Sequence, residues 1–264
     1  MRVWSVCNQK GGVGKTTTAV SLAGLLAERG QEVLLVDLDP HGSMSSYFGI
    51  NPDETEDTVY SLFEPGANTL SVMANTQSTK FAGISLLPAS TGLATLDRLM
   101  YKQQGMGLVL QQALARVARR FDFAIIDSPP IIGVLMINAL AACEQLLVPV
   151  QTEFLAMKGL ERMERTLEMI CISRKIEPDW LIVPTMYDQR TRASRQTLAH
   201  LQENYAKRIW AEVIPIDTRF RDAAKAGIPI SIASPETRGT AAYRHLLEHL
   251  ESAPQTALPT MATG

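Results

Sequence analysis

The chain has 264 residues, of which 46% are hydrophobic and 20% charged, with a net charge of −2 at pH 7. This length and composition suffice for one α/β domain with a sizeable core, and the near-neutral charge excludes a globally basic nucleic-acid binder, so any basic surface must be local. The three cysteines, Cys7, Cys143 and Cys171, lack metal-ligand or redox spacing and are typical of buried residues in a reducing compartment.

The chain begins with a predicted strand at residues 3–7, followed by a glycine-rich stretch, NQKGGVGKTTT, from Asn8 to Thr18. Apolar residues then recur at the spacing of one helix face, at Ala19, Leu22, Ala23 and Leu26. A strand, a glycine-rich turn and a helix form the context of a phosphate-binding loop, with backbone N–H groups and a helix N-terminus facing the anion. Lys15 is placed to reach the β- and γ-phosphates, and the Thr16 hydroxyl to bind magnesium.

The loop departs from the strict phosphate-loop pattern, because Gln9 stands where that pattern has glycine and Lys10 follows it. The seven residues KGGVGKT match the deviant Walker A motif of the ParA/MinD family of ATPases. This resemblance implies a three-layer, doubly wound α/β fold of the SIMIBI type with a mostly parallel sheet, and ATP and Mg²⁺ as cofactors. It implies ATP contacts from Lys10, Gly11, Gly12, Val13, Gly14, Lys15, Thr16 and Thr17. The alternative is a glycine-rich turn with two solvated lysines.

Lys10 and Lys15 are the two lysines to which the resemblance gives catalytic roles. In the family, the lysine at the position of Lys10 reaches across a nucleotide-sandwich dimer to the partner's ATP. No obvious arginine finger is present, which favours this role. The alternative for Lys10 is an exposed loop lysine.

A second apolar strand at residues 33–36 ends at Asp37 and leads into DLDPHGS, which extends to Ser43. Fully apolar strands that alternate with helices indicate a parallel sheet with its ligand at the carboxyl ends of the strands. The segment resembles switch I of the family, which implies that Asp39 orients the attacking water and that Asp37 and Asp39 lie in the metal site. Either aspartate could instead cap the following turn. The sequence assigns no role to His41, where family members often have Gln.

The middle of the chain supplies one more candidate ligand. Residues 51–80 are polar and weakly periodic, which indicates short helices and loops. We expect a strand at 84–87, a helix at about 106–120 and a strand at 124–126 that ends at Asp127. In a chain with a phosphate loop, this is typical of the Walker B aspartate that holds magnesium through a water. The alternative is a turn residue.

The second half contains predicted strands at 146–150 and 180–185, a helix with an apolar stripe at 160–170, and a final helix at about 239–250. Segments 186–195 and 213–243 resemble family segments, which implies that Met186 and Pro215 lie beside the adenine. The same segments carry cations that the family uses to bind DNA without sequence preference: Arg190, Arg192, Arg195, Arg219, Arg221 and Lys225. The alternative is a solvated helix face.

We therefore expect a single ATPase domain over residues 1–251 and a flexible tail over 252–264 without the basic amphipathic helix of a membrane anchor. The resemblance implies a bacterial cytoplasmic ATPase, nucleoid-associated or polar, that is slow and stimulated by a ParB-like or other cargo-linked protein. It would form an ATP-dependent homodimer, bind DNA and position a cargo.

The cargo would be a chromosome or plasmid partition complex, or a polar chemosensory array. The spelling DPHGS and the lack of a preceding DNA-reading domain resemble the chemosensory branch. Alternatives are a MinD-like peripheral-membrane regulator of division, and a metabolic ATP-dependent enzyme on the same scaffold.

Overall fold

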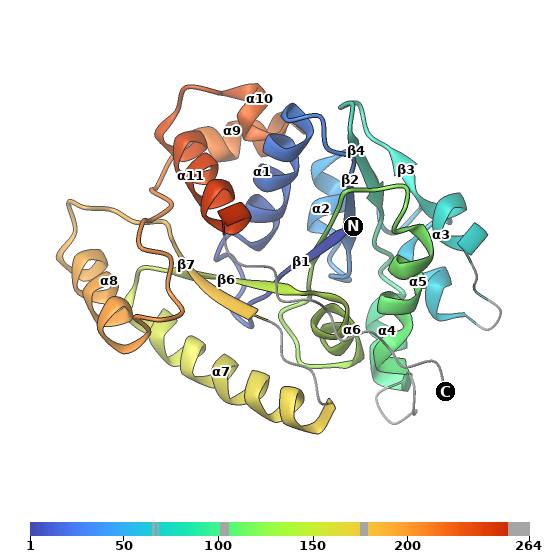
Figure 1. Ribbon diagram of the computed structural model, residues 1–264, viewed down its shortest axis with the longest axis horizontal. Helices are drawn as coiled ribbons and strands as arrows, with labels where there is room; N and C mark the ends of the chain where they lie inside the picture. The colour runs from blue at the N-terminus through green and yellow to red at the C-terminus, as the bar shows by residue number, and fades with distance from the viewer. Residues whose placement is uncertain (65–66, 68, 101–105, 175–178, 253–264) are drawn as a thin grey trace.

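The computed structural model describes residues 1–64, 67, 69–100, 106–174 and 179–252, so most of the expected tail lies outside the described residues. Its strands are β1 (Arg2–Val6), β2 (Val33–Asp37), β3 (Gln77–Ser78), β4 (Ile84–Leu87), β5 (Phe123–Asp127), β6 (Gln145–Gln151) and β7 (Asp179–Thr185). They form one sheet in the order β3-β4-β2-β5-β1-β6-β7, parallel throughout except for the pair β3 and β4. Figure 1 shows helices on both faces of this sheet, which confirms the predicted three-layer α/β fold.

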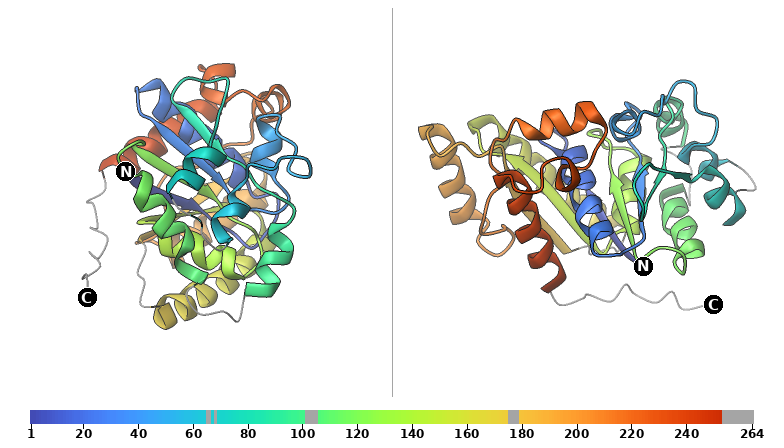
Figure 2. Two further views of the ribbon diagram at one scale, coloured as in Figure 1. Left: turned by 90° about the vertical axis from the view of Figure 1, so that its right-hand side faces the viewer. Right: turned by 90° about the horizontal axis from the view of Figure 1, so that it is seen from above.

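One face of the sheet is covered by α1 (Lys15–Glu28), α2 (Ser43–Tyr47), α9 (Arg219–Ala226), α10 (Ile230–Ala233) and α11 (Arg238–Ser252). The other is covered by the 3₁₀ helices η1 (Val59–Phe63) and η2 (Met106–Leu108) and by α3 (Thr69–Asn75), α4 (Leu93–Met100), α5 (Val109–Val117), α6 (Val134–Ala142) and α7 (Phe154–Arg174). The helix α8 (Arg192–Asn204) packs against α7. Figure 2 shows the same layers from two further directions.

The central strands are largely apolar because consecutive side chains enter two different cores. In β2, Leu34 and Val36 pack into the core on the α4–α7 side, whereas Val33 and Leu35 pack into the core on the α1 and α11 side. A polar residue inside such a strand would face one of the two cores. The aspartates of β2 and β5, Asp37 and Asp127, stand at the last positions of their strands.

The helices α4 and α6 are among those that were not predicted from the sequence. All nine residues of α6 are buried, so it has no polar face and produces no helical periodicity. The long apolar run at 131–150 is thus a buried helix followed by the strand β6. Within the described residues, no helix has both the length and the apolar character needed to cross a membrane.

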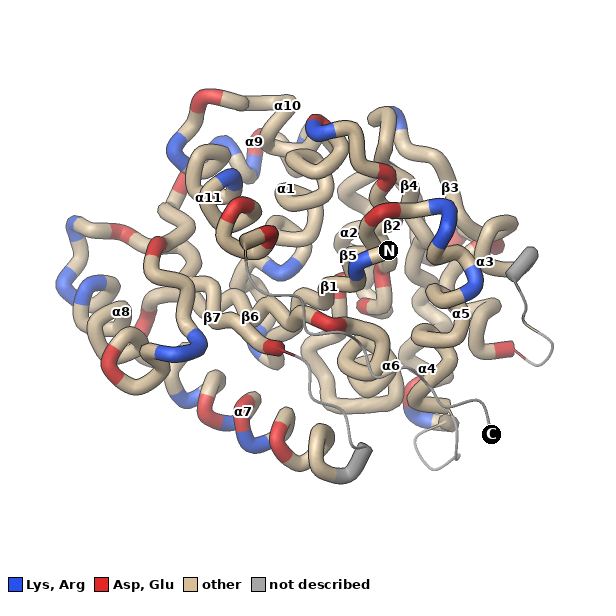
Figure 3. The backbone as a smooth tube through the Cα atoms, viewed as in Figure 1, with Lys and Arg blue, Asp and Glu red and all other residues tan. Residues whose placement is uncertain are grey.

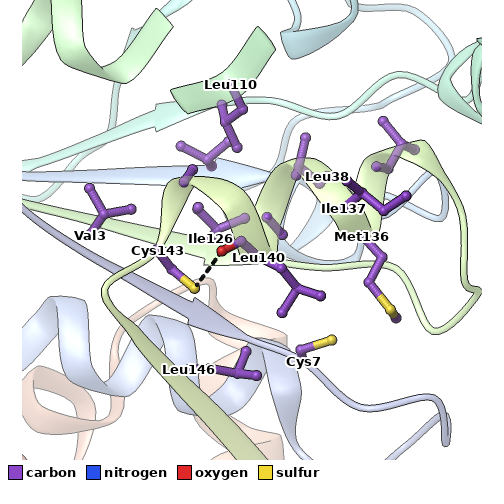
Figure 4. Close-up of a cluster of buried hydrophobic side chains, with 14 of the residues drawn as sticks. Val3, Cys7, Leu38, Leu110, Ile126, Met136, Ile137, Leu140, Cys143 and Leu146 are labelled. Carbon is purple, nitrogen blue, oxygen red and sulfur yellow. Dashed lines mark hydrogen bonds between the residues drawn. The ribbon is translucent and has the colours of Figure 1, made fainter. Parts of the chain in front are cut away.

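The cysteines Cys7 and Cys143 lie in the core on the α4–α7 side. Figure 4 shows both among aliphatic side chains, with the Cys143 thiol donating to the Leu140 carbonyl oxygen at 3.5 Å. Burial raises the pKa of the Cys7 thiol to about 11 and raises that of Cys143 as well. Both thiols are therefore protonated and unreactive at neutral pH.

Candidate nucleotide-binding site

The candidate site lies at the carboxyl ends of β1, β2 and β5. In the sheet register, Asp127 of β5 is level with Val6 of β1 on one side and with Asp37 of β2 on the other. The glycine-rich loop follows β1, and DLDPHGS begins at the end of β2. The parallel register thus brings three segments, far apart in the sequence, to one edge of the sheet.

The glycine-rich loop needs glycine for its backbone conformation. Gly12 and Gly14 have φ values of 74° and 95°, in the left-handed region that disfavours a side chain. A Cβ atom at either position would meet nothing within 4 Å, so conformation and not space imposes the requirement. Gly14 is also the N-cap of α1 and supplies no side-chain cap. The first N–H groups of this helix are therefore available to an anion.

A pocket of about 430 Å³ opens beside this loop. Its lining includes much of the predicted phosphate site together with residues from three other segments: Gly11, Gly12, Gly14, Lys15, Thr16, Thr17, Asp39, His41, Ser43, Pro130 and Met186. Lys15 is only 8% exposed. A buried cation in a pocket of this size, next to free N–H groups, suits a phosphate-bearing ligand.

Asp127 lies behind the pocket in contact with Thr16. The Thr16 hydroxyl donates to Asp127 Oδ2 at 2.5 Å, while Oδ1 is buried and has no partner among the described residues. Burial, reinforced by the negative charge of Asp37, raises the pKa of Asp127 to about 8. A partnerless carboxylate oxygen beside a threonine hydroxyl fits Mg²⁺, because a cation would satisfy the oxygen and offset the repulsion.

The three aspartates do not form a ligand set on their own. Within the described ranges, no group of three or more histidine, cysteine or acidic side chains could hold a metal ion. A magnesium ion here would therefore take most of its ligands from waters and phosphate oxygens, as Mg²⁺ usually does at nucleotide sites. The residues present fit such an ion.

Asp37 is occupied by its own neighbours. Its Oδ2 accepts from the Ser45 backbone N–H at 2.8 Å and from the Ser45 hydroxyl at 2.7 Å, and its Oδ1 accepts from the Asp39 N–H at 3.2 Å. Burial raises the pKa of Asp37 to about 6. These contacts favour the capping interpretation of Asp37, which holds the start of α2 in place. A direct metal role for it stays a prediction.

Asp39 differs from Asp37 because it lines the pocket. Its Oδ1 accepts from the His41 backbone N–H at 3.1 Å and contacts the His41 ring at Nδ1 at 2.8 Å. Asp37 and Asp39, which were both predicted to lie in the metal site, thus have different surroundings. Asp39 faces the pocket, and Asp37 supports the backbone behind it.

Lys10 is not among the residues that line the pocket. Its Nζ forms an ion pair with Glu153 and donates to Gln151 Oε1 at 3.3 Å. Asn8 fixes the backbone beneath it, because its Nδ2 donates to the Pro149 carbonyl at 2.7 Å and its Oδ1 accepts from the Lys10 N–H at 2.9 Å. The loop is therefore fastened to β6, with the Lys10 side chain directed to an acidic partner.

The predicted adenine contacts are only partly in the pocket. Met186 lines it, with a φ of 51° that is rare for a residue with a side chain. Pro215 lies beside Tyr187 in a short parallel bridge and is not part of the lining. Val13 accepts a hydrogen bond through its carbonyl from the Thr185 hydroxyl at 2.9 Å, which ties the loop to β7.

The predicted basic residues form two separate groups. Figure 3 shows cations before and at the start of α8 and others on α9, and the views in Figures 1 and 2 keep these helices apart. All six cations are exposed: Arg190, Arg192, Arg195, Arg219, Arg221 and Lys225. Arg190 forms a two-contact ion pair with Asp188 at 2.8 and 2.9 Å, which lowers the pKa of that aspartate to about 2. This pairing makes Arg190 less available to a partner than its neighbours.

The sequence did not predict the residues that form hydrogen bonds and ion pairs with the predicted site residues. Ser45 binds Asp37, while Gln151 and Glu153 bind Lys10. Gln151 ends β6, so the predicted parallel sheet already placed it at the same edge as the site. Ser45 could be found only from the turn geometry after β2, for which the sequence holds no specific signal.

Comparisons with known proteins agree with this geometry. A family model described as an AAA domain matches residues 1–178. The sporulation initiation inhibitor protein Soj of Bacillus subtilis is 32% identical over 252 residues, which cover 94% of this chain and 98% of Soj. The chromosome partitioning protein ParA of Myxococcus xanthus is 32% identical over 245 residues, with coverages of 92% and 85%.

A solved structure is similar along almost the whole chain. Cobyrinic acid a,c-diamide synthase from Mycobacterium smegmatis, with bound ADP and magnesium, has a TM-score of 0.79 and 33% identity, and the match covers 98% of this chain and 100% of that one. A second structure of that protein holds an ATP analogue and magnesium.

Proposed function

Since the chain belongs to the ParA/MinD family of deviant Walker A ATPases, we propose that it binds ATP with Mg²⁺ in the pocket beside the glycine-rich loop and hydrolyses it. The observation that carries the proposal is the pairing of Thr16 with Asp127, whose second carboxylate oxygen is buried without a partner beside a buried Lys15. Relatives with bound adenine nucleotide and magnesium support the choice of ligands.

Each residue has a separate task in the proposed reaction. The N–H groups of the loop and the Lys15 ammonium bind the phosphates, and Thr16 and Asp127 would hold the magnesium, Asp127 through a water. When bound, the ion neutralises charge on the phosphates. Asp39 orients the water, whose oxygen bonds to the γ-phosphorus as the bond to the bridging oxygen of ADP breaks. Positioning and charge neutralisation supply most of the acceleration.

We assign Lys10 to the ATP of a second subunit in a sandwich homodimer. Within its own subunit its ammonium is held by Glu153 and Gln151, outside the pocket lining, which supports a task elsewhere. The Lys10 and Glu153 side chains are 30% and 43% exposed, and ion pairs with this exposure contribute little to stability. Phosphate oxygens of a partner's nucleotide can therefore replace Glu153 at low cost.

The dimer is proposed to bind DNA through the exposed cations of α8 and α9, without sequence preference. Such binding rests on phosphate contacts, so its affinity should fall with salt. The name of the chromosome partitioning protein ParA supports a cargo connected with chromosome partitioning. We propose that a ParB-like activator releases this cargo. A polar chemosensory array is the other cargo, and both place the protein in the bacterial cytoplasm.

A metabolic ATP-dependent enzyme is the second candidate function. It is favoured by the 33% identity to cobyrinic acid a,c-diamide synthase. The two candidates differ in what they need for turnover, because a positioning ATPase releases phosphate with water as the only acceptor. Phosphate release that requires an added carboxylate and a nitrogen donor would favour the metabolic enzyme.

The proposed site is tested by the variant Lys15→Gln, with Lys207→Gln as the control at an exposed lysine outside the pocket. Removing the buried ammonium should weaken Mg·ATP binding by at least about tenfold, since a charge-assisted contact to phosphate is lost. Lys207→Gln should bind as the wild type does. Calorimetry on both variants measures this, and equal affinities would remove the phosphate-loop assignment.

A further inference from the structure

The residue His41 lines the nucleotide pocket, yet the proposed function gives it no task. Its side chain is 73% exposed, so it contributes nothing to a core. It nevertheless makes two contacts with the same atom, Oδ1 of Asp39. These contacts concern the carboxylate that orients the attacking water in the proposed reaction.

The two contacts fix one side of that carboxylate. Oδ1 of Asp39 accepts the His41 backbone N–H at 3.1 Å, and the ring Nδ1 of His41 lies 2.8 Å from the same oxygen. An ionised carboxylate only accepts hydrogen bonds, so the ring proton in this contact is on Nδ1. No described residue donates a hydrogen bond to Oδ2 of Asp39.

We propose that His41 is a positioning residue that holds Oδ1 of Asp39 and so leaves Oδ2 to orient the attacking water. The inference rests on the proposed hydrolysis of ATP. It identifies His41 as the residue that sets the rotation of the Asp39 carboxylate, which orients the water. A carboxylate whose rotation is fixed before the substrate binds needs no reorganisation during the reaction. His41 itself touches neither the water nor the γ-phosphate in this account.

Three substitutions separate this role from simple space filling. The amide nitrogen of Asn is as many bonds from the backbone as Nδ1 of histidine, so His41→Asn keeps a donor at the right distance for Oδ1. His41→Gln places its amide one bond further out, and His41→Ala has no donor. Because the His41 backbone N–H remains in every variant, the loss should be partial.

The experiment measures kcat for phosphate release and the affinity for Mg·ATP in each variant, with His200→Asn as a control at an exposed histidine on α8. His41→Gln and His41→Ala should lower kcat about fivefold, which is less than the full effect of losing a hydrogen bond to a charged group, because the ring is 73% exposed and the His41 backbone N–H still binds Oδ1. His41→Asn should stay within about twofold of the wild type, and all should bind Mg·ATP equally. His200→Asn should match the wild type.

The proposal is overturned if kcat is unchanged in all three His41 variants, or if His41→Asn falls as far as His41→Ala. Equal losses in affinity and no change in kcat would also contradict it, because the ring would then bind nucleotide directly. A wild type that binds ATP and releases no phosphate would overturn the proposed hydrolysis together with this inference. An active wild type with unresponsive variants would overturn the role of His41 alone.

Discussion

The buried charge of Asp127, the residue proposed to hold magnesium, predicts that this residue destabilises the protein when no magnesium is bound. The pKa of Asp127 is raised from its ordinary 3.8 to about 8. Between these values the folded protein holds a proton that the unfolded chain has lost, so the free energy of unfolding falls as pH rises, and the fall is complete above about pH 8. At about 1.4 kcal/mol per unit, the charge costs on the order of 5 kcal/mol at pH 8.

The variant Asp127→Asn removes this charge at a smaller cost. The amide keeps an acceptor for the Thr16 hydroxyl but buries an NH₂ group without a partner, which costs about 1–3 kcal/mol. The net gain at pH 8 is therefore about 2–4 kcal/mol, or roughly 5–15 °C in Tm for a chain of this size. At pH 5 the folded protein keeps Asp127 protonated, and taking up this proton costs only about 1–2 kcal/mol, so the gain should vanish.

Urea unfolding in EDTA at pH 5 and pH 8 measures the difference, with Asp53→Asn as the matched change at an exposed aspartate. Asp127→Asn should be the more stable protein at pH 8 in EDTA. In a separate measurement without EDTA, it should no longer be stabilised by added Mg·ATP. Asp53→Asn should follow the wild type at both pH values. If Asp127→Asn and the wild type lose stability in parallel between pH 5 and pH 8, the buried charge is not at Asp127.

Two further predictions follow from the contacts of the cations. Glu153→Gln removes the negative charge that pairs with Lys10 and should therefore favour the dimer. Sedimentation with ATP should show dimers at a severalfold lower protein concentration than for the wild type. An unchanged dimer dissociation constant would show that this contact does not compete with dimerisation. Replacing Arg219 and Arg221 together with alanine should weaken DNA binding with ATP present and reduce the salt slope by about 2, with ATP affinity unchanged. DNA binding as tight as in the wild type would remove α9 from the interface.

The fold could be predicted from the sequence because its strands carry a strong local signal. The strand β4 was predicted at its observed bounds, and β2 and β5 to within a residue at each end. The helix α6 was missed for the same physical reason that the strands were found. Burial on every side produces an unbroken apolar run, and such a run in a helix resembles a strand or a membrane span more than an amphipathic helix.

The parts of the candidate site that lie at strand ends and in the glycine-rich loop were predictable from the sequence. Lys15, Thr16 and Asp39 line the pocket, and Asp127 touches Thr16. Hydrogen-bond partners within the site were not predictable, because they depend on side-chain directions that the sequence does not encode locally. Ser45 forms a hydrogen bond with Asp37, and Glu153 forms an ion pair with Lys10. In the sequence, the position of neither Ser45 nor Glu153 distinguishes it from an ordinary surface residue.

The central claim is an ATPase whose active site is completed by Lys10 from a second subunit. The most direct measurement mixes two inactive variants, Lys10→Ala and Asp39→Ala, with ATP. In a mixed dimer, the Lys10→Ala subunit keeps its Asp39 and receives Lys10 from its partner, so one site of two is complete. With random pairing, the mixture should recover about a quarter of the wild-type rate. A rate no higher than the sum of the two variants alone would contradict the account and return Lys10 to its own subunit.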